Sequence, residues 1–182
     1  MKITIIRHGK TDSTVKGLRQ GSKTDLPLNE IGRKEVLSFK IQIGDSFDTV
    51  YSSPLKRAIE TARLLFPGHE IQINEFITEY DFGELEGVPF STPYDQFPEN
   101  TVEEYNGVEF LIPKDGETFK DVLTRCRHFL HFLKRNNQII DRIAVVTHGT
   151  NFEILKALGE QQVWHTYLGK AKDFNGFTQF EM

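Results

Sequence analysis

Two histidines of this chain, His8 and His148, are each followed by glycine and preceded by a short run of apolar residues. The residue immediately before the first of them is Arg7. An imidazole can act as a nucleophile or carry a proton, and a guanidinium donates paired hydrogen bonds to phosphate or carboxylate groups. The three side chains would therefore suit chemistry on an anionic group if the fold brings them together.

The segments before the two histidines predict the elements that would bring them together. Residues 2–6 and 142–146 are rich in β-branched residues and stop close to a glycine, which is typical of buried strands in a parallel sheet. In open α/β sheets the ligand crevice lies at the carboxyl ends of the strands, near the point where the strand order reverses. If these two strands are neighbours, both imidazoles and the Arg7 guanidinium face one pocket.

Strand and helix patterns alternate along the rest of the chain and predict an α/β fold. Residues 11–27 are polar and predict a loop, and residues 80–116 predict a small irregular cap insertion. Helices are predicted over about 29–43, 54–66, 117–136 and 150–158, and further strands over 48–52, 70–74 and about 174–180. This order indicates a single domain over residues 1–182, with a mostly parallel sheet between two layers of helices.

Composition restricts the class of protein. The chain has 182 residues, enough for one good core, and its formal net charge of -4 argues against a nucleic-acid partner. No apolar run is long enough for a signal segment or a membrane span, so we expect a cytoplasmic protein with no membrane partner. Cys126 is the only cysteine, which excludes an internal disulfide, and its helical surroundings predict a buried, inert thiol.

Several blocks of the sequence, taken in order, resemble the histidine phosphatase superfamily, which includes the cofactor-dependent phosphoglycerate mutases. A lone Arg-His-Gly tripeptide would be a weak signal, but the blocks together form a strong one and span residues 2 to about 158. They are residues 7–11, 19–21, 25–28, 52–62, 79–87 and 147–149. The resemblance implies a phosphoric monoester hydrolase that works through a phosphohistidine intermediate.

The resemblance also implies roles for individual residues. His8 matches the nucleophile, Arg7 and Arg57 the phosphate-binding arginines, Glu79 the proton donor, and His148 a further phosphate donor, expected to be an imidazolium. These types suit phosphoryl transfer, which spreads negative charge over three equatorial oxygens and needs one nucleophile on the reaction axis. Further phosphate contacts are expected from Thr11, Thr14, Gln20, Gly21, Gly149 and Thr150, with Thr14 standing where many family members have asparagine.

Two pKa values matter for this chemistry. The neighbouring guanidiniums are expected to disfavour a charged His8, which keeps its lone pair free. Glu79 needs a raised pKa to hold a proton. Asp81, Glu84 and Glu86 would raise it while the arginines oppose them, and the sequence leaves open which effect prevails.

Each of these residues also has a structural interpretation. A histidine after a strand can cap the following turn, Arg57 can be a solvated charge on a helix, and Glu79 is one acid among many. A metal site made of both histidines and a carboxylate is conceivable, but two flanking arginines would repel a dication. We therefore predict no metal and no cofactor, and surface or helix-face roles for the remaining histidines His69, His128, His131 and His165.

The predicted cap has an unusual charge. Residues 64–113 contain no lysine or arginine, whereas in the mutases this region carries cations for a second anion. The acids of this stretch are Glu70, Glu75, Glu79, Asp81, Glu84, Glu86, Asp95, Glu99, Glu103, Glu104 and Glu109. A second anion bound here would be unpaired, so the sequence favours a small phosphate monoester with a neutral, planar or apolar leaving group, such as a nucleoside-like or sugar moiety.

Aromatic residues of the same segment have two interpretations: they stack on the leaving group, or they only pack the cap. They are Phe82, Phe90, Tyr94, Phe97, Tyr105 and Phe110. Two other functions stay open at this point, namely a phosphoglycerate mutase or bisphosphatase type of phosphotransferase, and a non-catalytic module that binds a phosphorylated ligand.

Overall fold

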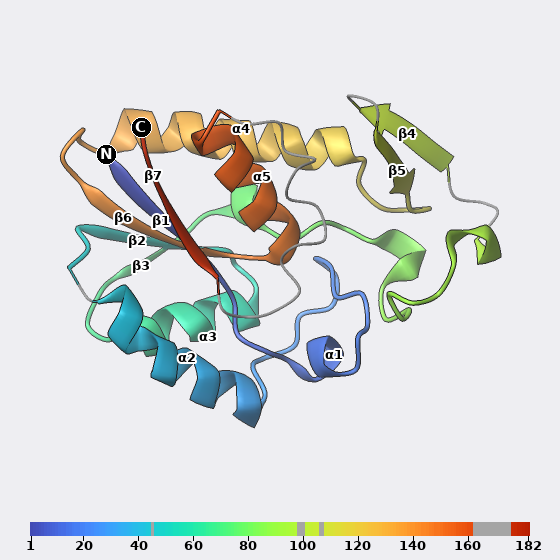
Figure 1. Cartoon of the computed structure of the whole chain (residues 1–182), viewed down its shortest axis with the longest axis horizontal. Coiled ribbons are helices and arrows are strands. Elements are labelled where there is room, and N and C mark those ends of the chain that lie inside the picture. Colours follow the sequence, from blue (N-terminus) through green and yellow to red (C-terminus); the bar gives the residue numbers. More distant parts are fainter. Residues whose placement is uncertain (45, 98–100, 106–107, 162–175) are drawn as a thin grey trace.

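A five-stranded sheet forms the centre of the protein (Figure 1). The computed structural model describes residues 1–44, 46–97, 101–105, 108–161 and 176–182. The sheet has the order β3-β2-β6-β1-β7, in which β7 alone is antiparallel to its neighbour. Its strands are β1 (Lys2–Arg7), β2 (Thr49–Ser52), β3 (Ile71–Ile73), β6 (Arg142–Thr147) and β7 (Phe177–Glu181). The predicted mostly parallel sheet is thus confirmed.

The central strands β1 and β6 are neighbours, as the sequence pattern required. They pair in parallel, with Arg7 opposite Thr147 at their carboxyl ends. Both strands have runs of buried residues, because helices cover both sides of the sheet. The residue that follows each strand is a histidine, so the register brings His8 and His148 to the same edge of the sheet.

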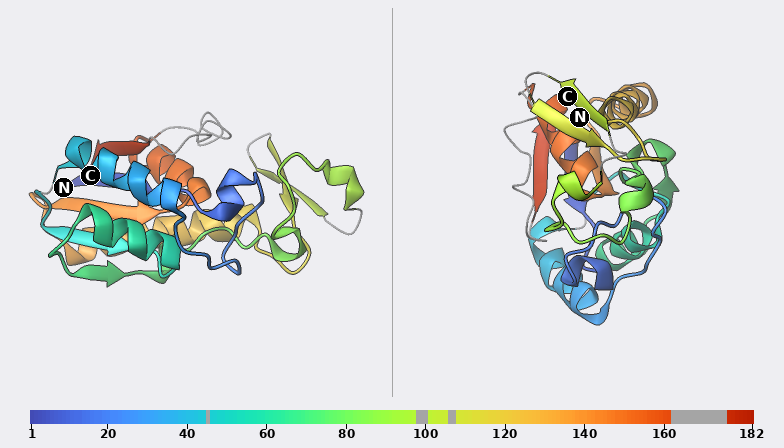
Figure 2. Two further views of the ribbon diagram at one scale, coloured as in Figure 1. Left: turned by 90° about the horizontal axis from the view of Figure 1, so that it is seen from below. Right: turned by 90° about the vertical axis from the view of Figure 1, so that its right-hand side faces the viewer.

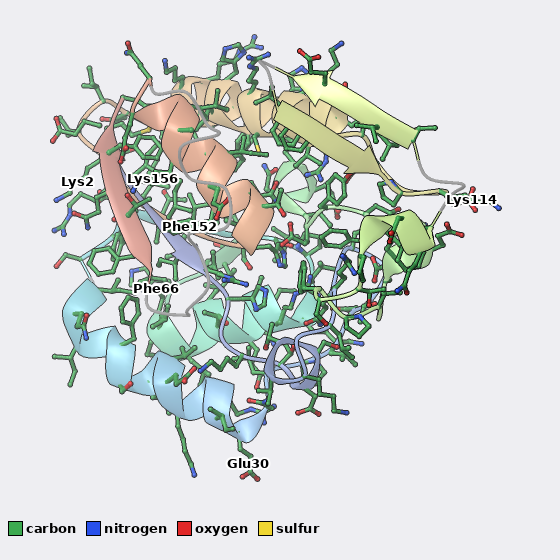
Figure 3. The ribbon with its side chains drawn as sticks, turned by 45° about the vertical axis from the view of Figure 1, so that its right-hand side comes forward. Lys2, Glu30, Phe66, Lys114, Phe152 and Lys156 are labelled. Carbon is green, nitrogen blue, oxygen red and sulfur yellow. The ribbon has the colours of Figure 1, made fainter. Side chains whose placement is uncertain are left out.

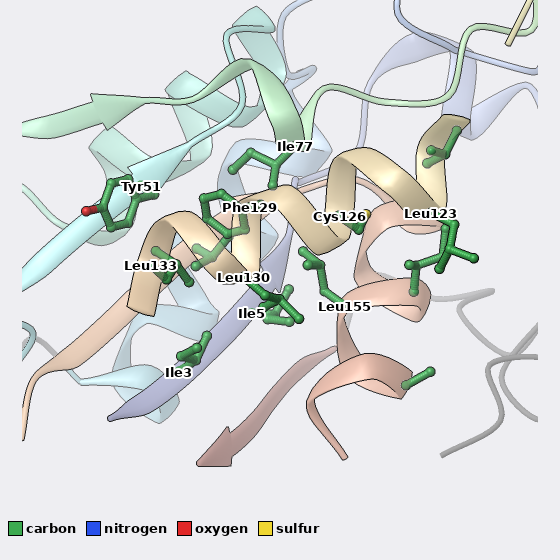
Figure 4. Packing of buried hydrophobic residues seen from close by; sticks show 14 of the residues in the cluster. Ile3, Ile5, Tyr51, Ile77, Leu123, Cys126, Phe129, Leu130, Leu133 and Leu155 are labelled. Atoms are coloured by element: carbon green, nitrogen blue, oxygen red, sulfur yellow. The ribbon is translucent and has the colours of Figure 1, made fainter. Parts of the chain in front are cut away.

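Two layers of helices enclose the sheet (Figures 1 and 2). The helices α2 (Glu30–Ile43) and α3 (Lys56–Leu65) cover one face, and α4 (Phe119–Asn136) and α5 (Gly149–Gly159) cover the other. Residues alternate between the two cores along β1: Ile6 packs with Val36 and Ala62, and Ile5 packs with Phe129 (Figure 4). This arrangement confirms the predicted three-layer α/β fold.

A short helix, α1 (Asp12–Val15), interrupts the segment that was predicted as a loop. Its cause is local, because Thr11 caps the helix and forms a capping box with Thr14. Two of the longer helices also begin at capping side chains, Asn29 before α2 and Thr118 before α4.

The segment between β3 and α4 contains more regular structure than predicted. It has three short 3-10 turns, η1 (Glu75–Ile77), η2 (Gly83–Leu85) and η3 (Tyr94–Gln96), and an antiparallel pair, β4 (Thr101–Tyr105) and β5 (Val108–Ile112). The prediction of an irregular cap was wrong at this pair. The Asn-Gly dipeptide at 106–107, between two runs of β-forming residues, is the hairpin signal that should have been used.

The pair β4–β5 lies at one end of the molecule (Figure 2). Lys114, which follows β5, and Lys2, at the start of β1, lie far apart at opposite ends (Figure 3). The carboxyl ends of the sheet strands therefore point toward the segment that carries β4 and β5. Among the described residues, no helix combines the length and apolar character needed to cross a membrane.

Candidate active site

His8 and His148 lie side by side at the carboxyl ends of β1 and β6. Their ring centroids are 5.0 Å apart, and the ring planes are tilted by 59°. Both side chains are almost completely buried. The structure thus brings together two imidazoles that 140 positions of sequence separate, because their strands pair in parallel without a register shift.

Arg57 completes this group from α3. It occupies the buried face of that helix and is fully buried, so it is not a solvated surface charge. Its Nε lies 3.3 Å from His8 Nε2 and 3.2 Å from His148 Nδ1. Its terminal nitrogens donate to the carbonyl oxygens of Thr24, at 2.8 Å, and Gly21, at 3.0 Å. Burial lowers the pKa of Arg57 to about 10, which still leaves it protonated at neutral pH.

The hydrogen bonds assign a tautomer to each imidazole. His8 Nδ1 lies 2.7 Å from the carbonyl oxygen of Gly9, which can only accept, so Nδ1 carries the proton and Nε2 carries the lone pair. His148 Nδ1 accepts from Arg57, and its Nε2 therefore carries the proton and donates to Ser53 Oγ at 2.7 Å. The nitrogen of His8 that faces Arg57 is thus the nucleophilic one.

Both imidazoles are neutral in this arrangement. Burial, Arg57 and Arg7 hold the pKa of His8 well below its usual value, as expected for a nucleophile with a free lone pair. Burial, Arg57 and His8 lower the pKa of His148 in the same way. The prediction that His148 is an imidazolium is wrong for this arrangement, because a proton on Nδ1 would face the N–H of Arg57. Neutral His148 remains a donor through Nε2.

Glu79 is buried beside this group. Its Oε1 accepts from the backbone N–H of Tyr80 at 2.8 Å, and its carboxylate also bonds the side chain of Thr150. Burial raises the pKa of Glu79, while the Tyr80 hydrogen bond, Arg57 and Arg7 oppose the rise. This is the direction that a proton donor requires, and burial is its cause.

The acids expected to raise the pKa of Glu79 are engaged elsewhere. Asp81 lies 3.1 Å from the Nζ of Lys23, and Glu84 is exposed. The Glu86 carboxylate accepts from the backbone N–H of Lys23 and from the hydroxyl of Thr24. The carboxylates of Asp81 and Glu86 therefore fix the loop around Lys23 rather than crowd Glu79.

Arg7 lies against the start of α5. A Cβ added to Gly149 would sit 3.4 Å from the Arg7 guanidinium, so the glycine leaves room for this close approach. The first backbone amides of α5, including those of Gly149 and Thr150, cannot find acceptors within the helix and carry the positive end of its dipole. Arg7, Arg57 and this helix end thus converge on His8 from different elements.

Three further predicted phosphate ligands bond one another. Thr11 Oγ1 donates to Gln20 Oε1 at 2.5 Å, and Gln20 Nε2 donates to the carbonyl oxygen of Thr24 at 3.2 Å. Thr14 Oγ1 donates to the carbonyl oxygen of Thr11 at 2.8 Å. In this arrangement their hydroxyl and amide groups hold the loop whose carbonyls orient Arg57, and a direct phosphate contact from them stays a prediction.

Gly21 allows this loop to pass close to the acid segment. Replacing Gly21 with alanine is expected to lower the free energy of unfolding by about 1–3 kcal/mol, measured by urea denaturation. The added Cβ would collide with the carbonyl oxygen of Tyr80 and with Glu86 Oε1. Ser46→Ala, at an exposed loop position, is the control. A Gly21→Ala variant as stable as the parent protein would contradict this contact.

Two residues near the histidines were not predicted as part of the site. Ser53 accepts from His148, and Thr61 Oγ1 accepts from the backbone N–H of Gly9 at 3.0 Å, beside His8. Both belong to the block 52–62, and Ser53 directly follows β2, a neighbour of β6. Its position at the same edge of the sheet could therefore have been predicted from the end of that strand.

The other titratable candidates lie away from this group. His128 and His131 are exposed on α4, as expected, and His69 Nε2 lies 3.2 Å from the carbonyl oxygen of Phe47; His165 lies outside the described residues. Burial raises the pKa of Cys126 to about 12, in agreement with an inert thiol. Among the described residues, no group of three or more His, Cys, Asp or Glu side chains is placed to hold a metal ion.

Ring contacts place three aromatic residues of the segment 80–116, Phe110, Phe82 and Phe90. Phe110 stacks on Phe119, with ring centroids 4.2 Å apart, and therefore packs against the core. Phe82 and Phe90 have centroids 6.2 Å apart, and the Arg19 guanidinium lies 5.3 Å from the Phe90 ring. Phe90 is 60% exposed and Phe82 lies next to Gly21, so this pair borders the loop that orients Arg57.

Comparison with known proteins gives the relatives of this chain. An adenosylcobalamin/α-ribazole phosphatase of Escherichia coli (strain K12) is 30% identical over 172 residues, which cover 91% of this chain and 84% of that protein. A 2,3-bisphosphoglycerate-dependent phosphoglycerate mutase of Rhizobium etli is 28% identical over 171 residues, covering 85% of this chain and 78% of the mutase.

Comparison with solved structures identifies the same kind of protein as the sequence comparison. A crystal structure assigned as an α-ribazole-5′-P phosphatase of Escherichia coli K-12 matches with a TM-score of 0.76 and 27% identity, covering 91% of this chain and 82% of that one. The model of the histidine phosphatase superfamily (branch 1) matches residues 3–167. Since this match spans nearly the whole chain, the protein belongs to the histidine phosphatase superfamily, whose members among these relatives are phosphatases and phosphoglycerate mutases.

Proposed function

We propose that the protein is a metal-independent phosphomonoesterase that transfers the phosphoryl group of a small phosphate monoester first to His8 and then to water. The observation that carries the proposal is the state of His8. Its Nδ1–H is fixed on the Gly9 carbonyl oxygen, and its neutral Nε2 lies between Arg57 and His148. A neutral imidazole held in one orientation among phosphate-binding groups is suited to nucleophilic attack on phosphorus.

In the first step, His8 Nε2 attacks phosphorus, and the bond between phosphorus and the ester oxygen breaks. Glu79, whose raised pKa favours the protonated form, gives its proton to the leaving alkoxide. The products are phosphohistidine, the free alcohol and the Glu79 carboxylate. In the second step this carboxylate takes a proton from water, the water oxygen attacks phosphorus, and the phosphorus–nitrogen bond breaks to release inorganic phosphate.

The positive charge for both steps comes from the protein. Arg57 and Arg7 and the amino end of α5 would face the equatorial oxygens, where charge accumulates in the transition state. Arg57 is held on the carbonyl oxygens of Thr24 and Gly21, so little reorganisation is needed when the phosphate binds. Neutral His148, whose N–H donates to Ser53, adds no charge to this group.

The substrate is a monophosphate whose leaving group carries no second anion. Residues 64–113, which include most of the cap over about 80–116, contain no lysine or arginine, and the nearby Lys23 already pairs with Asp81. The exposed Phe90, whose ring meets that of the core-packed Phe82 edge to face, offers an apolar surface instead. A nucleoside-like or sugar moiety fits this surface, and the relative named for α-ribazole phosphate is consistent with that class.

A mutase is the second candidate, because mutases are among the relatives. It would need cations for the second anion of a bisphosphorylated substrate, and the acidic segment disfavours this. A set of phosphate monoesters, assayed for released phosphate, tests the proposal, and bisphosphoglycerate tests the mutase. Release of phosphate from monoesters with neutral leaving groups is expected. Phosphoryl transfer between glycerate positions would overturn the proposal, and binding without turnover would indicate a non-catalytic module.

Removal of divalent metal is expected to leave activity unchanged. Guanidiniums occupy the place that Mg²⁺ takes in many phosphoryl-transfer enzymes, so chelation removes nothing that the two steps require. The measurement is turnover of a chromogenic phosphate ester before and after dialysis against EDTA. A large loss that Mg²⁺ or Zn²⁺ restores would contradict the proposed mechanism.

A further inference from the structure

An ion pair outside the group around His8 holds the segment that carries Glu79. Glu117, two residues before α4, and Arg125, about two turns into α4, form two parallel hydrogen bonds of 2.8 Å each. Both side chains are largely buried. Burial opposes the charge of Arg125, but the bonds to Glu117 outweigh it and raise the pKa of Arg125, so the guanidinium is always charged.

The guanidinium of Arg125 also binds the backbone before Glu79. Its Nη1 donates to the carbonyl oxygens of Phe76, at 2.8 Å, and Thr78, at 2.9 Å. Thr78 immediately precedes Glu79 in the chain. One planar side chain thus joins the Glu117 carboxylate to two carbonyls on the amino side of the proposed proton donor.

Glu117 binds the backbone after Glu79. Its Oε2 accepts from the N–H of Asp81 at 3.1 Å, and its own N–H donates to the Asp81 carbonyl oxygen at 3.0 Å. Its carbonyl oxygen accepts from the Tyr80 hydroxyl at 2.7 Å. The ion pair therefore brackets Glu79, with Arg125 on one side of it in the chain and Glu117 on the other.

This bracket is anchored in the rigid part of the fold. The carbonyl between the two that Arg125 binds, that of Ile77, accepts from Thr147 Oγ1 at 2.8 Å and from Asn151 Nδ2 at 3.2 Å. Arg125 itself stands on α4 beside the fully buried Cys126. The position of Glu79 is thus set by α4, β6 and α5 rather than by its own loop alone.

We propose that Arg125 and Glu117 are positioning residues that hold Glu79 at the ester oxygen of the substrate. The inference rests on the proposed role of Glu79 as proton donor. General acid catalysis needs hydrogen-bond distance between donor and leaving oxygen, and a displacement of about 1 Å can cost up to about 10²-fold in rate. A side chain that sets this distance affects catalysis without touching the substrate.

The test measures, by rapid quench, the rate at which each of two esters phosphorylates the protein. The esters are an alkyl phosphate and nitrophenyl phosphate. Arg125→Lys keeps the charge but loses the paired geometry, and Glu117→Gln keeps one acceptor oxygen but loses the charge. We expect both to slow phosphorylation by an alkyl phosphate by roughly tenfold or more, within the range for a displaced catalytic group, and to change phosphorylation by nitrophenyl phosphate much less. The control is Arg33→Lys, which alters the Arg33–Glu60 pair on the opposite side of the sheet.

The pH profile supplies a second readout. Arg57, Arg7 and the hydrogen bonds from Tyr80 and Thr150 oppose the rise in the pKa of Glu79, and the charge of Glu79 in turn raises the pKa of Arg125 and of the Cys126 thiol. Arg125→Lys preserves these charges, but a loosened segment admits water to Glu79 and removes part of the burial that raises its pKa. The alkaline limb of kcat/KM for the alkyl phosphate should therefore move to lower pH.

The Glu79→Gln variant, measured in parallel, distinguishes failure of the positioning role from failure of the proton-donor role. Equal losses on both esters, or an unmoved alkaline limb, in variants of normal melting temperature would overturn the positioning role while Glu79→Gln still discriminates between the esters. Loss of that discrimination in Glu79→Gln itself would instead overturn the proposed proton donor. If Arg125→Lys does not fold, the two esters are compared with Glu117→Gln alone.

Discussion

Replacing His8 with alanine is expected to lower kcat by at least about 10⁴-fold, since the variant loses the atom that forms the covalent intermediate. The loss should be similar for good and poor leaving groups, because both require the attack by Nε2. The measurement is phosphate release in the presence of EDTA, with the melting temperature recorded to show that the variant folds. His131→Ala, on the exposed face of α4, is the matched control and should retain full activity.

Activity of His8→Ala near that of the parent protein would contradict the assignment. His148 is the alternative nucleophile to exclude, because its Nδ1 faces the same Arg57 N–H as His8 Nε2. If His8 is the nucleophile, a His148→Ala variant should still form a phosphoenzyme.

Replacing Glu79 with glutamine is expected to slow phosphorylation by an alkyl phosphate by roughly 10²-fold or more, the usual scale of general acid catalysis. The loss should be smaller with nitrophenyl phosphate, whose leaving group departs without a proton. Pre-steady-state measurement is required, because Glu79 also assists hydrolysis of the phosphoenzyme and would mask the difference at steady state. Glu84→Gln, exposed in the same segment, is the control.

The pH dependence should follow the raised pKa of Glu79. The acid is functional while protonated, so kcat/KM for an alkyl phosphate should fall as the pH rises through that pKa, and Glu79→Gln should lack this limb. Equal losses for both esters in the phosphorylation step would contradict the role. Asp81 would then be the next acid to test, after its pair with Lys23 is removed.

The parts of the fold that were predicted correctly have strong local signals. Buried β-branched runs identified β1 and β6, and the helical stripe of α4 was visible in its apolar spacing. The meeting of His8 and His148 followed from one assumption, that their strands are neighbours. The helix α1 and the pair β4–β5, which were predicted as irregular, also had local signals, a capping box and an Asn-Gly dipeptide.

The parts that were not predicted depend on contacts between distant residues. The protonation of His148 follows from the direction of the Arg57 N–H, which no sequence pattern contains. The raised pKa of Glu79 comes from burial by the folded chain rather than from neighbouring acids. Arg125 and Glu117 lie eight positions apart in the sequence. Their effect on the segment of Glu79 appears only when α4 lies beside that segment.

Trapping of the phosphoenzyme tests the central claim most directly. The protein is mixed with labelled phosphate monoester in EDTA, quenched in alkali, digested and mapped. The account predicts an acid-labile, alkali-stable phosphoryl group on the peptide that contains His8, absent from His8→Ala, together with overall retention of configuration when a chiral phosphate ester is hydrolysed. Inversion at phosphorus, which indicates a single direct displacement by water, would contradict the phosphohistidine mechanism.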